Sequence, residues 1–152
     1  MMNPHQILLV KTSFHAALPQ SERLSGYFFA ELFIREPALW HLFRSKAGMR
    51  WPALVDGLAS IVAAIDRLHP IAPVLEWLAI QGAGRGIGER HYAAVGQALI
   101  AALEAGLGDD FGPDHRQAWT GACRAVSAVM VEALEEQPLA AWLKFVSHQA
   151  EV

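Results

Sequence analysis

Apolar side chains recur at intervals of three and four residues along most of this chain, which is the spacing of one face of an α-helix. The series is clearest between residues 50 and 67, where it consists of Trp51, Leu54, Val55, Leu58, Ile61, Val62 and Ile65. Pro52 falls near the start of this segment, where a missing N–H costs a helix little. No segment alternates like a β-strand, so the pattern predicts an all-α protein.

The same periodicity predicts further helices over residues 21–36, 37–43, 73–82, 89–107 and from 113 onward. Ser21 is a suitable cap for the first of them. Glycines at 82, 84, 86 and 88 each disfavour helix by about 1 kcal/mol, so we expect a helix to end near Gly82 and a loop to follow. Six to eight helices around one core are therefore expected.

The composition of the chain excludes several classes of protein. Its 152 residues, 53% of them apolar, suit one domain with one core. A net charge of -3 shows no basic footprint for nucleic acid, and the single Cys123 excludes an internal disulfide or a multi-cysteine zinc site. No apolar run is long enough for a membrane span, and residues 1–6 do not read as a signal peptide, so we expect a cytoplasmic protein.

The end of the chain has its own apolar cluster. After Pro138 the sequence carries Leu139, Trp142, Leu143, Phe145 and Val146. We therefore divide the chain into a domain over residues 1–136 and a tail over 137–152 that is compatible with a helix. The tail either folds back on the core or contributes to a homodimer contact, and the second interpretation is preferred because an exposed apolar patch needs a partner.

Several short motifs occur in an order that is typical of one family. Residues 28–33 (FFAELF) and 37–43 (PALWHLF) resemble the second and third helices of bacterial globins. Gly86-Ile87, residues 91–96 (HYAAVG) and Ala118-Trp119 are similar to later landmarks of the same family. The resemblance covers roughly residues 7–134 and implies the globin fold, with single-domain bacterial globins and the globin part of flavohaemoglobins as the nearest types.

The resemblance implies that the usual iron ligand is missing. The family's proximal histidine falls at Gly82, which has no side chain to bind iron, and neither Gln81 nor Ala83 replaces it. No histidine lies between His69 and His91. Gly82 can equally be read as an ordinary helix end, but that reading supplies no ligand either.

Other positions carried over from the family are also altered. The distal tyrosine falls at Phe29, which keeps the ring and loses the donor. The distal glutamine or histidine falls at or near Arg50, followed by Trp51. Tyr92 matches a tyrosine that hydrogen-bonds the proximal histidine, and Phe43 matches one that packs on the haem face. The resulting candidate cofactor-binding set is Phe29, Phe43, Arg50, Trp51, Leu54, Gly82, Ile87 and Tyr92.

Some of these residues allow two interpretations. His91 is either an unusual ligand or a helix-start residue near the surface, and the second is preferred. Arg50 either guards the pocket mouth, pairing with a carboxylate, or is a surface arginine. Cys123 reads as a small core residue rather than a reactive thiol. Trp51 either lines a cavity together with Phe29 or fills it.

Three hypotheses about function follow. The preferred one is a globin without conventional haem that binds a small apolar molecule or a protein partner. The second is a globin that holds haem b through apolar contacts with Phe43, Leu54 and Ile87, helped by Arg50, and binds oxygen or another diatomic gas through an exogenous or non-standard iron ligand. The third is an enzyme, which we do not expect: the ligands of iron chemistry are altered, and no flavin or nicotinamide domain for a self-contained NO dioxygenase is recognised.

Overall fold

The computed structural model describes residues 2–40 and 51–150, with side chains placed as far as residue 135. The described residues form α1 (Pro4–Ala17), η1 (Leu18–Gln20), α2 (Ser21–Arg35), α4 (Trp51–Ala63), η2 (His69–Ile71), α5 (Ala72–Ala83), α6 (Glu89–Leu107), η3 (Gly108–Asp110) and α7 (Pro113–Ala150). The η elements are short 3₁₀ turns, and no strand occurs within these two ranges. The predicted all-α class is confirmed.

Helix α1 is the element that the apolar periodicity did not reveal. The sequence nevertheless contains a signal for the start of α1, because Asn3 and Gln6 form a reciprocal capping box. The Gln6 N–H donates to Asn3 Oδ1 (2.8 Å), and the Asn3 N–H donates to Gln6 Oε1 (3.1 Å). The predicted cap at Ser21 is wrong. Gln20 precedes α2 without a side-chain cap, because η1 leads directly into the helix.

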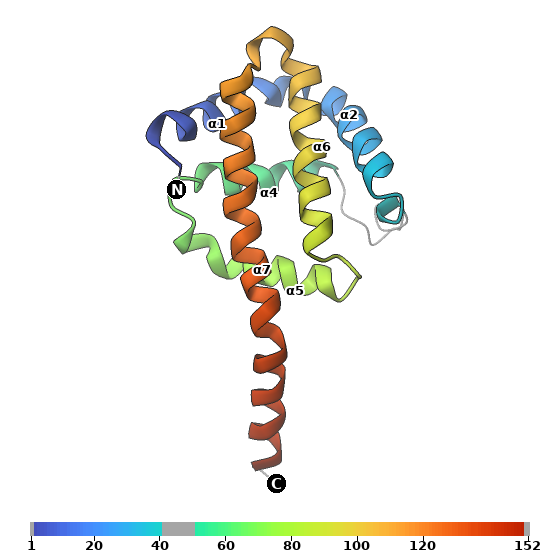
Figure 1. Ribbon diagram of the computed structural model, residues 1–152, viewed down its shortest axis with the longest axis vertical. Coiled ribbons are helices and arrows are strands. Elements are labelled where there is room, and N and C mark those ends of the chain that lie inside the picture. Colours follow the sequence, from blue (N-terminus) through green and yellow to red (C-terminus); the bar gives the residue numbers. More distant parts are fainter. Residues whose placement is uncertain (1, 41–50, 151–152) are drawn as a thin grey trace.

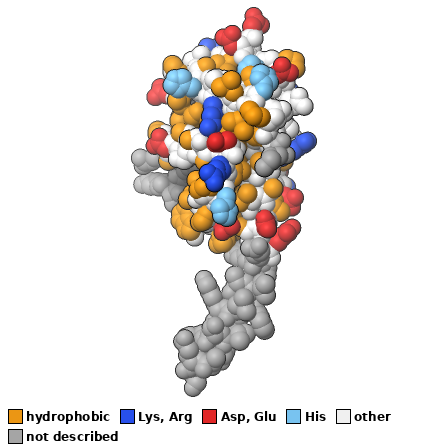
Figure 2. Space-filling view, turned by 90° about the vertical axis from the view of Figure 1, so that its left-hand side faces the viewer, with side chains coloured by type: hydrophobic (Ala, Val, Ile, Leu, Met, Phe, Trp, Pro, Cys, Tyr) orange, Lys and Arg blue, Asp and Glu red, His pale blue; other side chains and the backbone are white. Residues whose placement is uncertain are grey.

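The long helices α6 and α7 run antiparallel and lie against each other, joined by the short η3 turn (Figure 1). Helices α4 and α5 cross behind this pair, while α2 packs on α6 and α1 packs on α7. On the face seen in Figure 2, acidic, basic and hydrophobic side chains are interspersed. None of the described helices is long and apolar enough to cross a membrane.

The contact between α2 and α6 joins large side chains to small ones. Leu24, Phe28 and Leu32 are each at most 5% exposed and form one face of α2. The opposing positions of α6 are small and recur every fourth residue: Ala94, Ala98, Ala102 and Gly106. A Cβ placed on Gly106 would overlap Leu24 Cδ2, so the two helix axes approach as far as glycine permits.

Two clusters of buried side chains make up the core. One joins α1, α4, α6 and α7 around Trp119, whose Nε1–H donates to the buried Ser13 Oγ at 2.8 Å. The other lies between α2 and α6. Trp51 and Leu99 pack against both clusters and connect them. The expected single core is therefore continuous through these two residues.

Helices α6 and α7 contact each other at a glycine and a cysteine. A Cβ on Gly96 would lie 3.3 Å from both Cβ and Sγ of Cys123, so even an alanine at position 96 would require Cys123 to shift by a few tenths of an ångström. Burial raises the pKa of the Cys123 thiol from 9.0 to about 11. This agrees with the prediction that Cys123 is a packing residue rather than a reactive thiol.

The ends of α5 and α7 test two sequence predictions. Helix α5 ends at Ala83, as the glycine-rich stretch predicts, and the following turn contains Gly86 with φ of 88°, a conformation that favours glycine. Helix α7 instead continues as one helix across Pro138 to Ala150. The division into a domain over 1–136 and a tail over 137–152 stays a prediction.

Replacing Gly106 tests the close approach of α2 and α6. We expect Gly106→Ala to lower the free energy of unfolding by about 1–3 kcal/mol, because the added methyl overpacks the contact with Leu24. Gly57→Ala is the matched control. Gly57 lies inside α4 with no atom within 4 Å of its Cβ position, so this change raises stability by about 0.5–1 kcal/mol. Urea unfolding of the three proteins checks both signs, and an unchanged Gly106→Ala protein would contradict the packing.

The raised pKa of Cys123 predicts slow chemistry at its thiol. At pH 8 the folded chain should react with Ellman's reagent more slowly than the urea-unfolded chain, because the folded thiol ionises only near pH 11. Because the pKa of Cys123 is higher in the folded than in the unfolded chain, its contribution to the free energy of unfolding is fully present below pH 9. This contribution is lost as the pH rises from 9 to 11, where the unfolded chain loses its thiol proton first. Cys123→Ala should lack this component of the pH dependence, and equal reaction rates in the folded and unfolded chains would contradict the burial.

Candidate functional site

An aromatic cluster occupies the space between α2 and the start of α4. Phe28 and Phe29 lie next to each other on α2, with ring centroids 5.2 Å apart. Trp51, the first residue of α4, packs on both, with centroid distances of 5.6 Å to Phe28 and 5.8 Å to Phe29. The ring of Phe33 stacks on Phe29 at 5.6 Å. Four rings therefore contact one another in a region that the sequence associated with a ligand pocket.

The structure brings several of the predicted site residues to this cluster. The half-buried side chains of Phe29, Trp51, Leu54 and Ile87 all pack against the buried residues shared by α2 and α6. Phe43 and Arg50 lie outside the described residues. The grouping was predicted from the family resemblance, while the ring-on-ring packing of Trp51 emerges only from the structure.

Gly82 lies in the last turn of α5 and faces Ile87. A Cβ on Gly82 would be 3.4 Å from the Cβ of Ile87, which is ordinary van der Waals contact. The Ile87 N–H also donates to the Gly82 carbonyl oxygen at 2.9 Å. A side chain at position 82 would therefore leave the helix toward Ile87 and contact it.

Two polar side-chain atoms are buried and have no hydrogen-bond partner among the described residues. They are Trp51 Nε1 and the Tyr92 hydroxyl oxygen. Burial also raises the pKa of Tyr92. A buried donor without an acceptor typically costs about 1–3 kcal/mol, so each is a position where a bound molecule or another side chain would gain a hydrogen bond. Tyr92 itself lines a groove between α6 and α7.

His91 is held at the start of α6 by contacts at both ring nitrogens. Its Nδ1 accepts a hydrogen bond from the Gly88 N–H at 2.8 Å, so in the neutral ring the proton belongs on Nε2. That nitrogen lies 3.9 Å from the Glu36 carboxylate, which also pairs with Arg90 at 2.9 Å. The predicted helix-start role agrees with these contacts, but His91 is 8% exposed and thus buried rather than near the surface. The sequence analysis did not identify Glu36 as its partner.

Neither Gly82 nor His91 offers a free side-chain ligand for an iron. Gly82 has no side chain, and both nitrogens of His91 face other groups. No cluster of three or more His, Cys, Asp or Glu that could hold a metal ion occurs in the part of the chain that the structure describes. Apolar and aromatic surface is plentiful, so the site suits an apolar body better than a metal centre.

Comparison with known proteins identifies the family. The model of the family described as Globin matches residues 27–130, more than half of the chain. The chain is 29% identical over 134 residues to a flavohemoprotein of Bacillus subtilis, covering 86% of this chain and 34% of that protein. It is 27% identical over 127 residues to a flavohemoprotein of Halalkalibacterium halodurans, covering 82% and 31%, and 26% identical over 134 residues to one of Bordetella parapertussis, covering 86% and 33%.

The chain therefore spans about a third of the length of these flavohemoproteins. The matched residues run from α2 into α7 and include both the aromatic cluster and Gly82. Together with the all-α architecture, the match establishes that this chain belongs to the globin family.

Proposed function

We propose that this globin does not ligate haem iron in the usual way and acts as a binding or interaction module for a small apolar molecule or a protein partner. The observation that carries the proposal is Gly82, the residue at the position that the family resemblance assigns to the proximal histidine. Gly82 lies in the last turn of α5, and a Cβ at this position would point toward Ile87, an apolar residue that cannot bind iron.

The isolated hydroxyl of Tyr92 supports the same proposal. The resemblance assigns Tyr92 the role of hydrogen-bonding the iron-ligating histidine. With glycine at position 82 that histidine is absent, and the buried hydroxyl has no hydrogen-bond partner among the described residues. An unpaired buried hydroxyl is the expected trace of a lost partner.

The aromatic cluster determines what such a pocket can hold. Phe29 lacks the hydroxyl that would donate to a bound gas, and its ring is packed against Phe33 and Trp51. Among the described residues of the cluster, the donor is Trp51 Nε1–H, which is buried and has no described hydrogen-bond partner. A matching ligand would have an apolar body and one acceptor atom directed at this indole.

A second candidate function is haem binding with a diatomic gas ligand. Membership of the globin family and similarity to proteins named flavohemoproteins favour it. Haem b would then rest on apolar contacts with residues such as Leu54 and Ile87, together with Phe43, and Arg50 would pair with a propionate. Its iron would need an exogenous or non-standard ligand. We propose binding rather than catalysis for either candidate.

A haem titration of the purified chain distinguishes the two candidates. If Gly82 abolishes ligation, added haemin should give no stoichiometric Soret band and no shift with CO after reduction. Gly82→Ala is the matched control, because it fills the position without adding a ligand, and should behave like the parent chain. A one-to-one, CO-sensitive Soret band in the parent chain would overturn the proposal in favour of haem binding.

If the parent chain does not bind haem, Gly82→His distinguishes two reasons: a missing iron ligand, or a lack of space for the macrocycle. A stoichiometric Soret band in Gly82→His alone would mean that only the ligand is lacking and that space for the macrocycle persists. If Gly82→His stays colourless while remaining folded, the Trp51 cluster occupies that space. Circular dichroism of each variant checks the fold.

A further inference from the structure

The outer face of α5 exposes a row of large apolar side chains. Val74 and Trp77 are 58% and 59% exposed, and Ile80 is 38% exposed. The three follow one another at three-residue steps, so they lie along one side of the helix. Single exposed apolar side chains are ordinary on a protein surface, whereas a contiguous row marks an interaction site.

This side of α5 carries no charged residue. Residues three or four positions from Trp77 share its side of the helix, and all of them are uncharged: Pro73, Val74, Ile80 and Gln81. Glu76 is the charged residue of α5, and it lies one position before Trp77, about 100° around the helix. We call the uncharged row, with Trp77 at its centre, the α5 stripe.

The opposite side of α5 fixes the orientation of the stripe. Leu75 and Ala79 are fully buried, and α5 packs against α7. Because interiors are close-packed, the helix cannot turn the stripe inward without breaking this contact. The stripe therefore faces outward as long as the chain is folded.

The backbone at both ends of α5 is hydrogen-bonded within the chain. At its start the Ile71 N–H donates to the Leu68 carbonyl oxygen at 3.0 Å, and the Ala72 N–H donates to that of His69. Pro73 has no N–H to satisfy. At its end the N–H groups of residues 84–87 donate to the carbonyl oxygens of residues 80, 82 and 83. Free backbone groups are costly away from water, so these ends suit an apolar surrounding.

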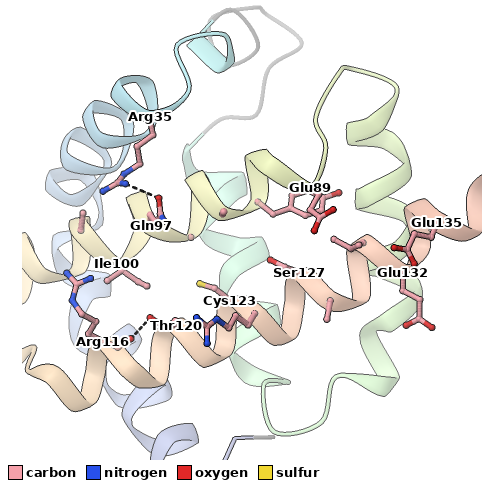
Figure 3. Close-up of a pocket in the computed structure, with 17 residues that line it drawn as sticks. Arg35, Glu89, Gln97, Ile100, Arg116, Thr120, Cys123, Ser127, Glu132 and Glu135 are labelled. Atoms are coloured by element: carbon pink, nitrogen blue, oxygen red, sulfur yellow. Dashed lines mark hydrogen bonds between the residues drawn. The ribbon is translucent and has the colours of Figure 1, made fainter.

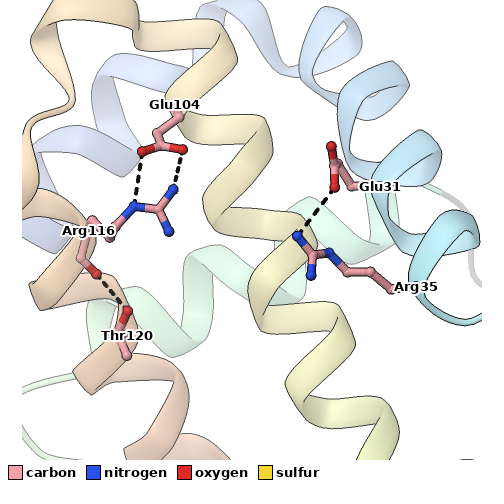
Figure 4. Close-up of polar contacts among 5 residues, drawn as sticks. All are labelled: Glu31, Arg35, Glu104, Arg116 and Thr120. Carbon is pink, nitrogen blue, oxygen red and sulfur yellow. Dashed lines mark hydrogen bonds and ion pairs between the residues drawn. The ribbon is translucent and has the colours of Figure 1, made fainter.

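Two other surface features of the described structure carry charge instead. Along the groove between α6 and α7, Figure 3 shows glutamates at one end and arginines at the other. Ile34 on α2 is 76% exposed, but it lies within one turn of Glu31 and Arg35, which pair at 3.4 Å (Figure 4). Charged groups favour contact with water, so the α5 stripe is the surface best suited to an apolar phase.

The stripe is too small to form a stable protein interface by itself. The 12 residues of α5 span about 18 Å, and a helix is about 10 Å wide, so this side covers about 180 Å². A stable interface buries about 800 Å² on each partner. A lipid surface has no such minimum, because headgroups and acyl chains adapt to one helix.

We propose that the α5 stripe is a docking surface for a phospholipid bilayer, on which α5 lies in the plane of the headgroups. Val74 and Ile80 enter the boundary of the acyl chains. The Trp77 indole suits this depth, because its ring is apolar and its N–H reaches the polar headgroups. The inference is independent of whether the chain binds haem.

The charges beside the stripe favour anionic headgroups. Arg67 precedes η2, Arg85 follows α5, and both are exposed. An arginine side chain extends along apolar surface while its guanidinium stays among polar groups. Asp66 already pairs with Lys11 at 3.3 Å, which leaves Glu76 as the carboxylate of α5 that opposes binding. We therefore expect tighter binding to anionic than to neutral bilayers.

Vesicle cosedimentation of the full chain tests the proposal. The parent chain should sediment with vesicles of phosphatidylcholine and phosphatidylglycerol in equal amounts, and more weakly with phosphatidylcholine alone. Trp77→Ser should lower the partition coefficient by about tenfold or more, and Val74→Ser by a smaller factor, because each removes apolar area from the contact. Added salt should reduce the difference between the two kinds of vesicle.

Ile34→Ser is the matched control. It removes an exposed apolar side chain from α2 and should leave binding unchanged. Phospholipids brominated on their acyl chains quench an indole that enters the bilayer, so they should quench the parent chain. Trp77→Phe keeps an apolar ring in the stripe and should still bind, but this quenching should be lost. Circular dichroism of each variant checks the fold.

Failure to sediment with either kind of vesicle would overturn the proposal, with a protein partner as the alternative occupant. Binding that survives Trp77→Ser would contradict it, and so would an equal loss of binding in Ile34→Ser. Quenching that persists in Trp77→Phe would mean that another segment enters the bilayer, which would also overturn the assignment to α5.

Discussion

The close approach of α2 and α6 is the constraint on which the rest of this structure depends. Large side chains on α2 meet alanines on α6, and Gly106 admits Leu24 where even a methyl group would collide. Because interiors are close-packed, this contact determines how far apart the two helices lie. It thereby determines where Phe28 and Phe29 present their rings to the start of α4.

Trp51 connects the α2–α6 contact to the rest of the core. Its indole packs on Phe28 and Phe29 and also touches the cluster built around Trp119. The residue that could line a ligand pocket is therefore also the link between the two halves of the core. A large, rigid side chain in this position contributes to stability by its burial, and no described residue provides an acceptor for its Nε1.

The start and the middle of α6 make different kinds of contact. Near its start, His91 Nδ1 accepts a hydrogen bond from the Gly88 N–H, and the Glu36 carboxylate lies 3.9 Å from Nε2. In its middle, Gly96 and Cys123 bring α6 and α7 close together. The side of α6 that faces α2 and the side that faces α7 are consequently built by different positions of the same helix.

The sequence by itself determined the helical class, most helix bounds and the family, because apolar periodicity, glycine-rich breaks and motif order are local properties of the chain. It also indicated Gly82 as the altered ligand position and grouped Phe29, Trp51, Leu54 and Ile87 in one site. It did not reveal α1, whose signal is a capping box rather than an apolar stripe, nor the burial of His91 against Glu36, which is distant in sequence.

Only the tertiary structure decided that Trp51 packs ring against ring with Phe28 and Phe29, that Ile87 covers Gly82, and that opposite charges gather at opposite ends of the α6–α7 groove. The physical reason is that periodicity specifies which face of a helix is buried but not which residue of another helix it meets. That pairing depends on side-chain volumes and interhelical distances, which exist only once the helices are packed.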